Sequence, residues 1–153
     1  MSTSEVNQTR GAAAAVNAGS LSDGNGDLAG PLPEWWASVE RAFQTLLTWP
    51  DDWDSYGAAA PRREAVDAAR VLLTVLVRRL DVVEPYPSAT RNGGVFLEWR
   101  RNGHEIDVEI ESLTDITFAY ENMQTGEQVC GESKSADENT ALLLGLLEQH
   151  FCQ

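Results

Sequence analysis

The Asn102–Gly103 pair constrains the fold of this chain more than any other feature. Asn-Gly favours a two-residue type I′ turn, because both central positions of that turn need a positive φ angle. A two-residue loop also sets the register of the strands that it joins. The apolar residues then face one another on one side of the pair: Trp99 with Ile106, Leu97 with Val108, and Val95 with Ile110. Turn chemistry and alternation agree, so the sequence predicts an antiparallel hairpin with one apolar face.

Other segments place further elements around this hairpin. Apolar residues at helical spacing predict one helix between Pro33 and Pro50 and a second over about 62–80. The segment "ITFAY" predicts a third strand, and "GEQVCGE" is a weaker candidate for a fourth. In "SADENTALLLGLLEQHF", Ser135 and Glu138 match a capping box at the start of a final helix. This order predicts an α+β fold: two N-terminal helices, an antiparallel sheet of three or four strands, and a C-terminal helix packed on the Trp99 face.

The first 30 residues differ in composition from the rest of the chain. They contain mainly Ser, Asn, Gly, Ala and Thr, which bury too little apolar area to offset the entropy of ordering. The sequence predicts a disordered tail over 1–30 and a single α+β domain over 31–153. No apolar run approaches the roughly 20 residues of a membrane span, and no secretory signal is apparent. Cys130 and Cys152 have neither metal nor disulfide spacing, so we expect a cytoplasmic protein.

The net charge of −13 is concentrated in the C-terminal third. Residues 31–101 contain ten acids and nine bases, whereas residues 102–153 contain eleven acids and one base, Lys134. Such a field disfavours nucleic acid and an anionic membrane as partners. It favours a basic protein partner, or it serves solubility alone.

The predicted register also determines which residues point away from the core. Phe96 faces Glu109, Glu98 faces Asp107, and Arg100 faces Glu105. Glu98 opposite Asp107 is a like-charge pair, which costs a few tenths to about 1 kcal/mol.

Three interpretations of this face remain open. It is a solvated outer surface, a docking surface for a basic partner with Phe96 as an anchor, or a carboxylate cluster for a hard cation. A flat open sheet lacks the concavity that catalysis usually needs. The candidate partner-binding residues are Phe96, Glu98, Glu105, Asp107 and Glu109.

The segment "DDWDSYGAAAP" resembles a cation-binding loop only superficially. Counted from Asp52, an EF-hand loop would need an acid or amide where Tyr56 stands and a Glu where Arg63 stands. Two interpretations remain: a helix-to-helix turn held by Trp53 and Tyr56, or a ligand loop formed by Trp53, Asp54 and Tyr56.

Three segments together carry a family resemblance. "DWDSYGA", "GGVFLEW" and the alternating "EIDVEIE" resemble a group of small uncharacterised bacterial proteins with a Trp-Asp-x-Tyr-Gly-Ala segment and a Gly-Gly-x-x-Leu-Glu-Trp segment. The resemblance covers roughly residues 50–120. It implies a bacterial or phage setting and a loop and hairpin that belong to one unit, and it implies no activity.

No segment carries a recognisable catalytic or cofactor motif. There is no nucleophile motif and no phosphate-binding loop, and neither His104, expected to be exposed at the hairpin tip, nor His150 has a second ligand at metal spacing. We therefore expect no catalytic residue, no metal and no cofactor.

The expected function is a non-enzymatic binding module of the immunity, antitoxin, inhibitor or accessory-subunit type. The alternatives are a small metal-dependent hydrolase using Asp52, Asp54 or the sheet acids, and a secretion-type chaperone. An uncovered sheet face or edge would also allow a homodimer.

Overall fold

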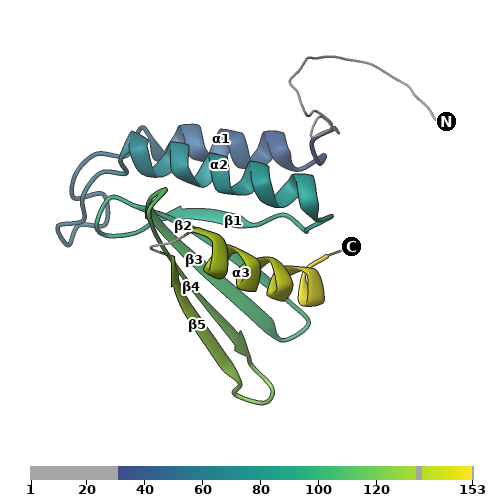
Figure 1. Ribbon diagram of the computed structural model, residues 1–153. Helices are drawn as coiled ribbons and strands as arrows, with labels where there is room; N and C mark the ends of the chain where they lie inside the picture. The colour runs from purple at the N-terminus through teal and green to yellow at the C-terminus, as the bar shows by residue number, and fades with distance from the viewer. Residues whose placement is uncertain (1–30, 134–135, 153) are drawn as a thin grey trace. The chain divides into compact units, whose positions relative to one another are not determined.

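The computed structural model describes residues 31–133 and 136–152, and it has the predicted α+β architecture (Figure 1). Its elements are α1 (Trp36–Leu46), α2 (Arg63–Arg79), β1 (Tyr86–Ala89), β2 (Val95–Arg101), β3 (His104–Ser112), β4 (Asp115–Asn122), β5 (Gln128–Ser133) and α3 (Ala136–His150). Five strands replace the expected three or four. The predicted tail over 1–30 and the Ser135 cap lie outside the described residues.

The five strands form one antiparallel sheet in the order β1-β2-β3-β4-β5. Asn102 and Gly103 have φ angles of 53° and 81°, as a type I′ turn requires. The predicted register is confirmed, with Trp99 opposite Ile106 and Glu98 opposite Asp107. The short β1 strand was missed because Pro87 interrupts it and its four residues show no alternation.

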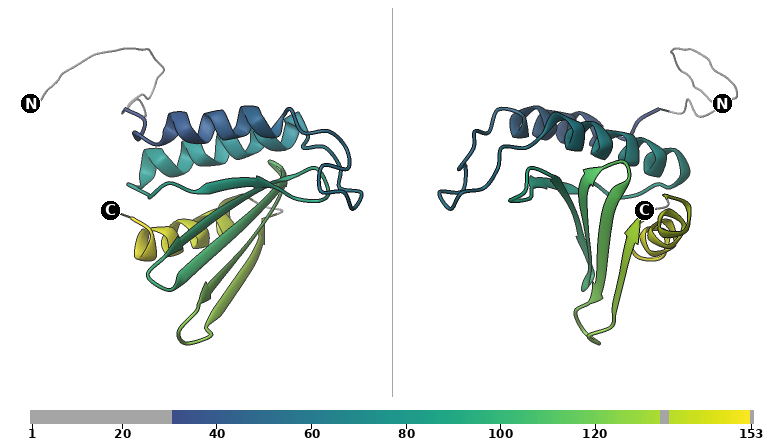
Figure 2. Two further views of the ribbon diagram at one scale, coloured as in Figure 1. Left: turned by 180° about the vertical axis from the view of Figure 1, so that it is seen from behind. Right: turned by 60° about the vertical axis from the view of Figure 1, so that its left-hand side comes forward.

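One face of the sheet forms the core. α2 packs on β2 and β3, and α3 packs against β5, while α1 runs beside α2 and lies against β1 (Figures 1 and 2). Trp99 is 1% exposed, and its indole N–H donates to the Val83 carbonyl oxygen at 2.9 Å. Leu73 of α2 and Leu147 of α3 are fully buried in the same core. The helices therefore cover the Trp99 face, as predicted.

The glycine pair of "GGVFLEW" joins three parts of the chain. Gly93 has a φ of 87°, and a Cβ at this position would lie 3.0 Å from the Ala60 carbonyl oxygen. A Cβ at Gly94 would lie 2.8 Å from the Ile110 carbonyl oxygen and would also overlap the Glu111 carboxylate. These close approaches hold the loop before α2, the turn before β2 and the end of β3 together.

Among residues 31–133 and 136–152, no helix combines the length and the apolar character needed to cross a bilayer.

Candidate functional site

The predicted acidic residues do gather on one face of the sheet, opposite the core. We call this surface the acidic face and define it by the outward-pointing residues of β2 to β5. Its charged members are Glu98, Arg100, Glu105, Asp107, Glu109, Glu121 and Glu132, with Phe96 beside them. Phe96, Glu98, Glu105 and Asp107 are partly buried, and Glu109 is exposed. Glu121 and Glu132 were missed, although the alternation along β4 and β5 indicated the same face.

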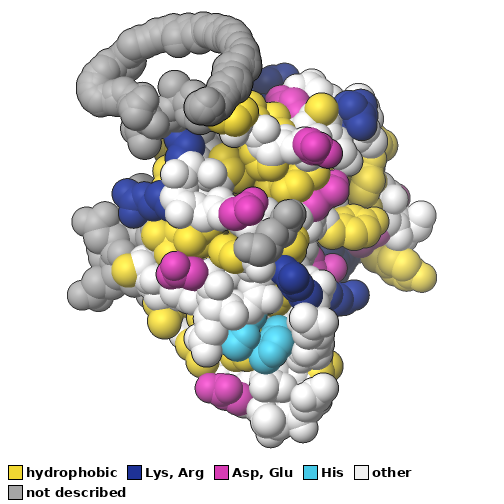
Figure 3. All heavy atoms as spheres, turned by 90° about the vertical axis from the view of Figure 1, so that its right-hand side faces the viewer, with side chains coloured by type: hydrophobic (Ala, Val, Ile, Leu, Met, Phe, Trp, Pro, Cys, Tyr) yellow, Lys and Arg dark blue, Asp and Glu magenta, His cyan; other side chains and the backbone are white. Residues whose placement is uncertain are grey.

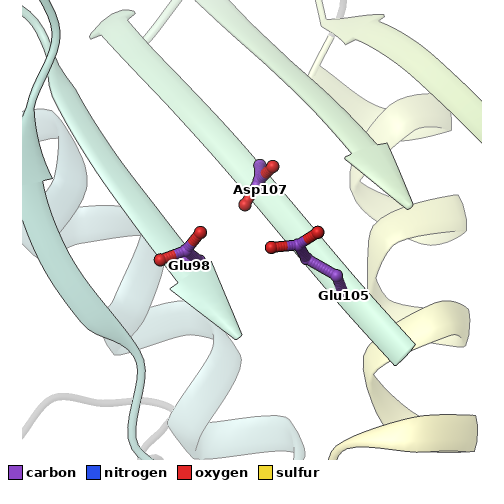
Figure 4. Close-up of side chains that lie close together, drawn as sticks. All are labelled: Glu98, Glu105 and Asp107. Atoms are coloured by element: carbon purple, nitrogen blue, oxygen red, sulfur yellow. The ribbon is translucent and has the colours of Figure 1, made fainter. Parts of the chain in front are cut away.

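Glu98, Glu105 and Asp107 form a carboxylate trio at the centre of this face. One oxygen from each residue lies within 4.8 Å of the others, and the side chains converge on the space between β2 and β3 (Figure 4). Arg100 donates to Glu98, with Nη2 2.6 Å from Oε2, and its Nε donates to Glu105. The hydrogen bond to Glu105 is the main cause of a raised pKa at Arg100. One guanidinium therefore balances two of the three acids.

Asp107 is the member of the trio that has no such partner. Its Oδ1 atom is buried and makes no hydrogen bond within the described residues. Burial, and after it the negative charges of Glu105 and Glu98, together raise the pKa of Asp107 to about 6. An unsatisfied buried acceptor costs about 1–3 kcal/mol. The site therefore holds a carboxylate that a proton or a cation would stabilise.

A shallow hollow adjoins Asp107 on the same face. Its volume is about 440 Å³, and its lining includes Phe96, Asp107, Glu109, Ala119 and Glu132. Phe96 thus forms a wall of a depression with an acidic surround. This combination suits the aliphatic stem and charged head of a lysine or arginine side chain. Three carboxylates can also hold a hard cation, but that ion would compete with Arg100 for Glu98 and Glu105.

The acids of the predicted ligand loop, unlike the described acids of the acidic face, accept hydrogen bonds from the backbone. Each carboxylate accepts a backbone N–H of the loop itself: Asp51 from Ala60, Asp52 from Gly57, and Asp54 from both Tyr56 and Ala58. The Nε of Arg91 also donates to Asp54 Oδ2 at 2.9 Å. These contacts, led by the Tyr56 N–H, lower the pKa of Asp54. The loop acids therefore stabilise the turn.

The aromatic residues of this loop lie in different environments. Trp53 packs on Trp49, with ring centroids 4.9 Å apart, and its indole N–H donates to the Ala59 carbonyl oxygen at 2.9 Å. Tyr56 is 82% exposed. Of the three residues predicted to form a ligand loop, only Tyr56 presents its side chain freely to solvent.

The two histidines lie in contact, although their spacing along the sequence gave no sign of it. Their ring centroids lie 4.0 Å apart, and His104 Nδ1 is 2.8 Å from the Tyr120 hydroxyl (Figure 3). His104 is partly buried, so its predicted exposure at the hairpin tip is wrong. Burial and the neighbouring His104 lower the pKa of His150. Spacing along the chain gave no signal for this pair, because the docking of α3 creates it.

Comparison with protein-family models, with curated proteins and with solved structures finds no match.

Proposed function

We propose that this protein is a non-enzymatic binding module whose acidic face docks a basic protein partner. The observation that carries the proposal is Asp107, a partly buried carboxylate whose Oδ1 is unsatisfied and which has a second acid, Glu98, directly opposite on β2. Such an arrangement lowers the stability of the free protein. Features that break a local folding rule tend to occur at functional sites.

The charge distribution supports the same conclusion. Arg100 is the one base at the outward positions of β2 to β5 among the described residues, and Glu98 and Glu105 already occupy it. The remaining acids leave a negative field that would steer a basic surface toward this face. A partner's ammonium or guanidinium group would also relieve the repulsion around Asp107.

The test begins with the full chain as an immobilised bait in a lysate of the native host. A captured partner is then purified, and its Kd is measured at low and high salt. We expect a basic protein whose affinity falls at least tenfold for Glu109→Lys, a charge reversal at an exposed position. Glu148→Lys, on the exposed side of α3, is the matched control and should change the affinity little. A partner with equal affinity for both variants would contradict the proposal.

A metal-dependent hydrolase is the second candidate, and the convergence of the carboxylate trio within 4.8 Å favours it. Calorimetric titration with magnesium, calcium and manganese separates it from the binding module. Micromolar binding that disappears in Glu105→Gln would support the hydrolase, whereas millimolar or weaker binding would leave the binding module as the better account. A captured partner that is an unfolded secreted chain would instead indicate a chaperone.

A further inference from the structure

A groove of about 780 Å³ lies between α1 and β1, at the border of the acidic face. Trp49, which follows α1, lines one side of the groove, and the residues Glu84–Ser88 line the other. Glu98 lies in the groove and also belongs to the acidic face. A ligand in this groove would therefore also contact the acidic face, through Glu98.

The groove is lined by two carboxylates, two prolines and the side chain of Arg100. Pro85 and Pro87 have no N–H, and a proline in an edge strand stands where that N–H would point away from the sheet. Within the described residues, β1 pairs only with β2, so Pro87 leaves this edge without its donor. Glu84 and Glu98 add carboxylates, while the guanidinium of Arg100 already donates to Glu98 and Glu105. These carboxylates suit a ligand that supplies donors and positive charge.

Two aromatic side chains add a second requirement. Tyr86 is 68% exposed, a large fraction for an aromatic residue. Trp49 is partly buried, and its contact with Trp53 holds its ring in place. Aromatic faces attract cations, and a planar guanidinium can also stack on them.

We propose that this groove receives an arginine side chain of the partner. This inference rests on the proposed function, because the arginine belongs to the same basic protein. Arginine has five N–H donors, no acceptor and a flat charged surface, which match acceptors, carboxylates and aromatic walls. Lysine offers a compact charge without the flat surface, so the groove distinguishes the two bases.

The test compares fluorescently labelled hexa-arginine and hexa-lysine peptides by anisotropy titration with the full chain. We expect the arginine peptide to bind about fivefold more tightly than the lysine peptide. Tyr86→Ser should abolish this preference, and Tyr86→Phe should keep it because the aromatic face remains. Tyr56→Ser, at a position that is 82% exposed and outside the groove, is the control and should also keep it.

The outcomes separate this inference from the proposed function. Equal affinities for the two peptides, or a preference that survives in Tyr86→Ser, would overturn the arginine groove. If Glu109→Lys then weakens both peptides equally, the acidic face still binds bases and the proposed function stands. If neither peptide binds at low salt, the arginine groove is again excluded, and the partner capture with its charge-reversed variants decides the proposed function separately.

Discussion

The loop before α2 and the centre of the sheet each contain three acids, but the two clusters are stabilised in opposite ways. In the loop, every carboxylate accepts at least one backbone N–H of its own segment. On the sheet, Glu98 and Glu105 share one arginine, and Asp107 keeps a buried oxygen with no partner in the described chain. Hydrogen bonds lower the pKa of Asp54, whereas burial raises that of Asp107.

The charged loop acids therefore stabilise the fold, whereas a charged Asp107 on the sheet destabilises it. Asp54 contributes stability when it is charged, and that contribution is lost as the pH falls through its lowered folded-state pKa. Asp107 contributes most when it is protonated, and that contribution is lost as the pH rises from about 4 to about 6. Asp54 in the loop and Asp107 on the sheet thus predict opposite responses to pH. Among the described residues, the buried carboxylate oxygen without a hydrogen bond belongs to the sheet cluster.

The largest expected effect comes from Gly94→Ala, which disturbs the packing of the turn before β2 on the end of β3. The new Cβ would lie 2.8 Å from the Ile110 carbonyl oxygen, so backbone must move. We expect a loss of about 3 kcal/mol in the free energy of unfolding, measured by urea denaturation. Gly145→Ala is the control: α3 leaves open space there, and the better helix propensity of alanine should raise stability slightly. A Gly94→Ala midpoint equal to wild type would show that the turn before β2 does not closely approach the end of β3.

The next effect is expected at Asp54. Asp54→Ala removes the acceptor for two backbone N–H groups and the partner of Arg91, so the loop should loosen. We expect the melting temperature to fall by roughly 4–8 °C, measured by circular dichroism at neutral pH. Asp54→Asn retains an acceptor oxygen and should lose less. An unchanged melting temperature in Asp54→Ala would mean that the loop acids are as dispensable as surface charges.

The elements that the sequence predicted well are those whose signals are local. The register around Asn102–Gly103 followed from turn chemistry. That register also predicted that Glu98 lies opposite Asp107. β1 lacks such a signal, because its strand character comes from pairing with β2.

The site was predicted less completely than the strands. Parity along β2 and β3 placed the acids on one face and predicted that Arg100 could reach Glu105 or a diagonal acid, and its hydrogen bond to Glu105 is present. The burial of Asp107 and the groove beside α1 depend on how distant elements pack. The contact between His104 and His150 depends in the same way on where α3 docks. Spacing along a chain does not encode these properties.

The smallest expected effect is the most direct test of the difference between the two clusters. Asp107→Asn removes the repelled charge and supplies an amide donor between neighbouring carboxylates, so it should stabilise the protein. We expect a gain of about 1 kcal/mol at pH 7.5 in the free energy of unfolding, after allowance for solvent screening of a partly exposed group.

Because the folded-state pKa of Asp107, about 6, exceeds the ordinary value of 3.8, wild-type stability should decline from about pH 4 to pH 6. Urea denaturation across this range should show a shallower decline in Asp107→Asn. Glu109→Gln removes an exposed charge from the same face and should keep the wild-type slope. A destabilised Asp107→Asn would place Asp107 with the structural acids, and the sheet would then no longer differ from the loop.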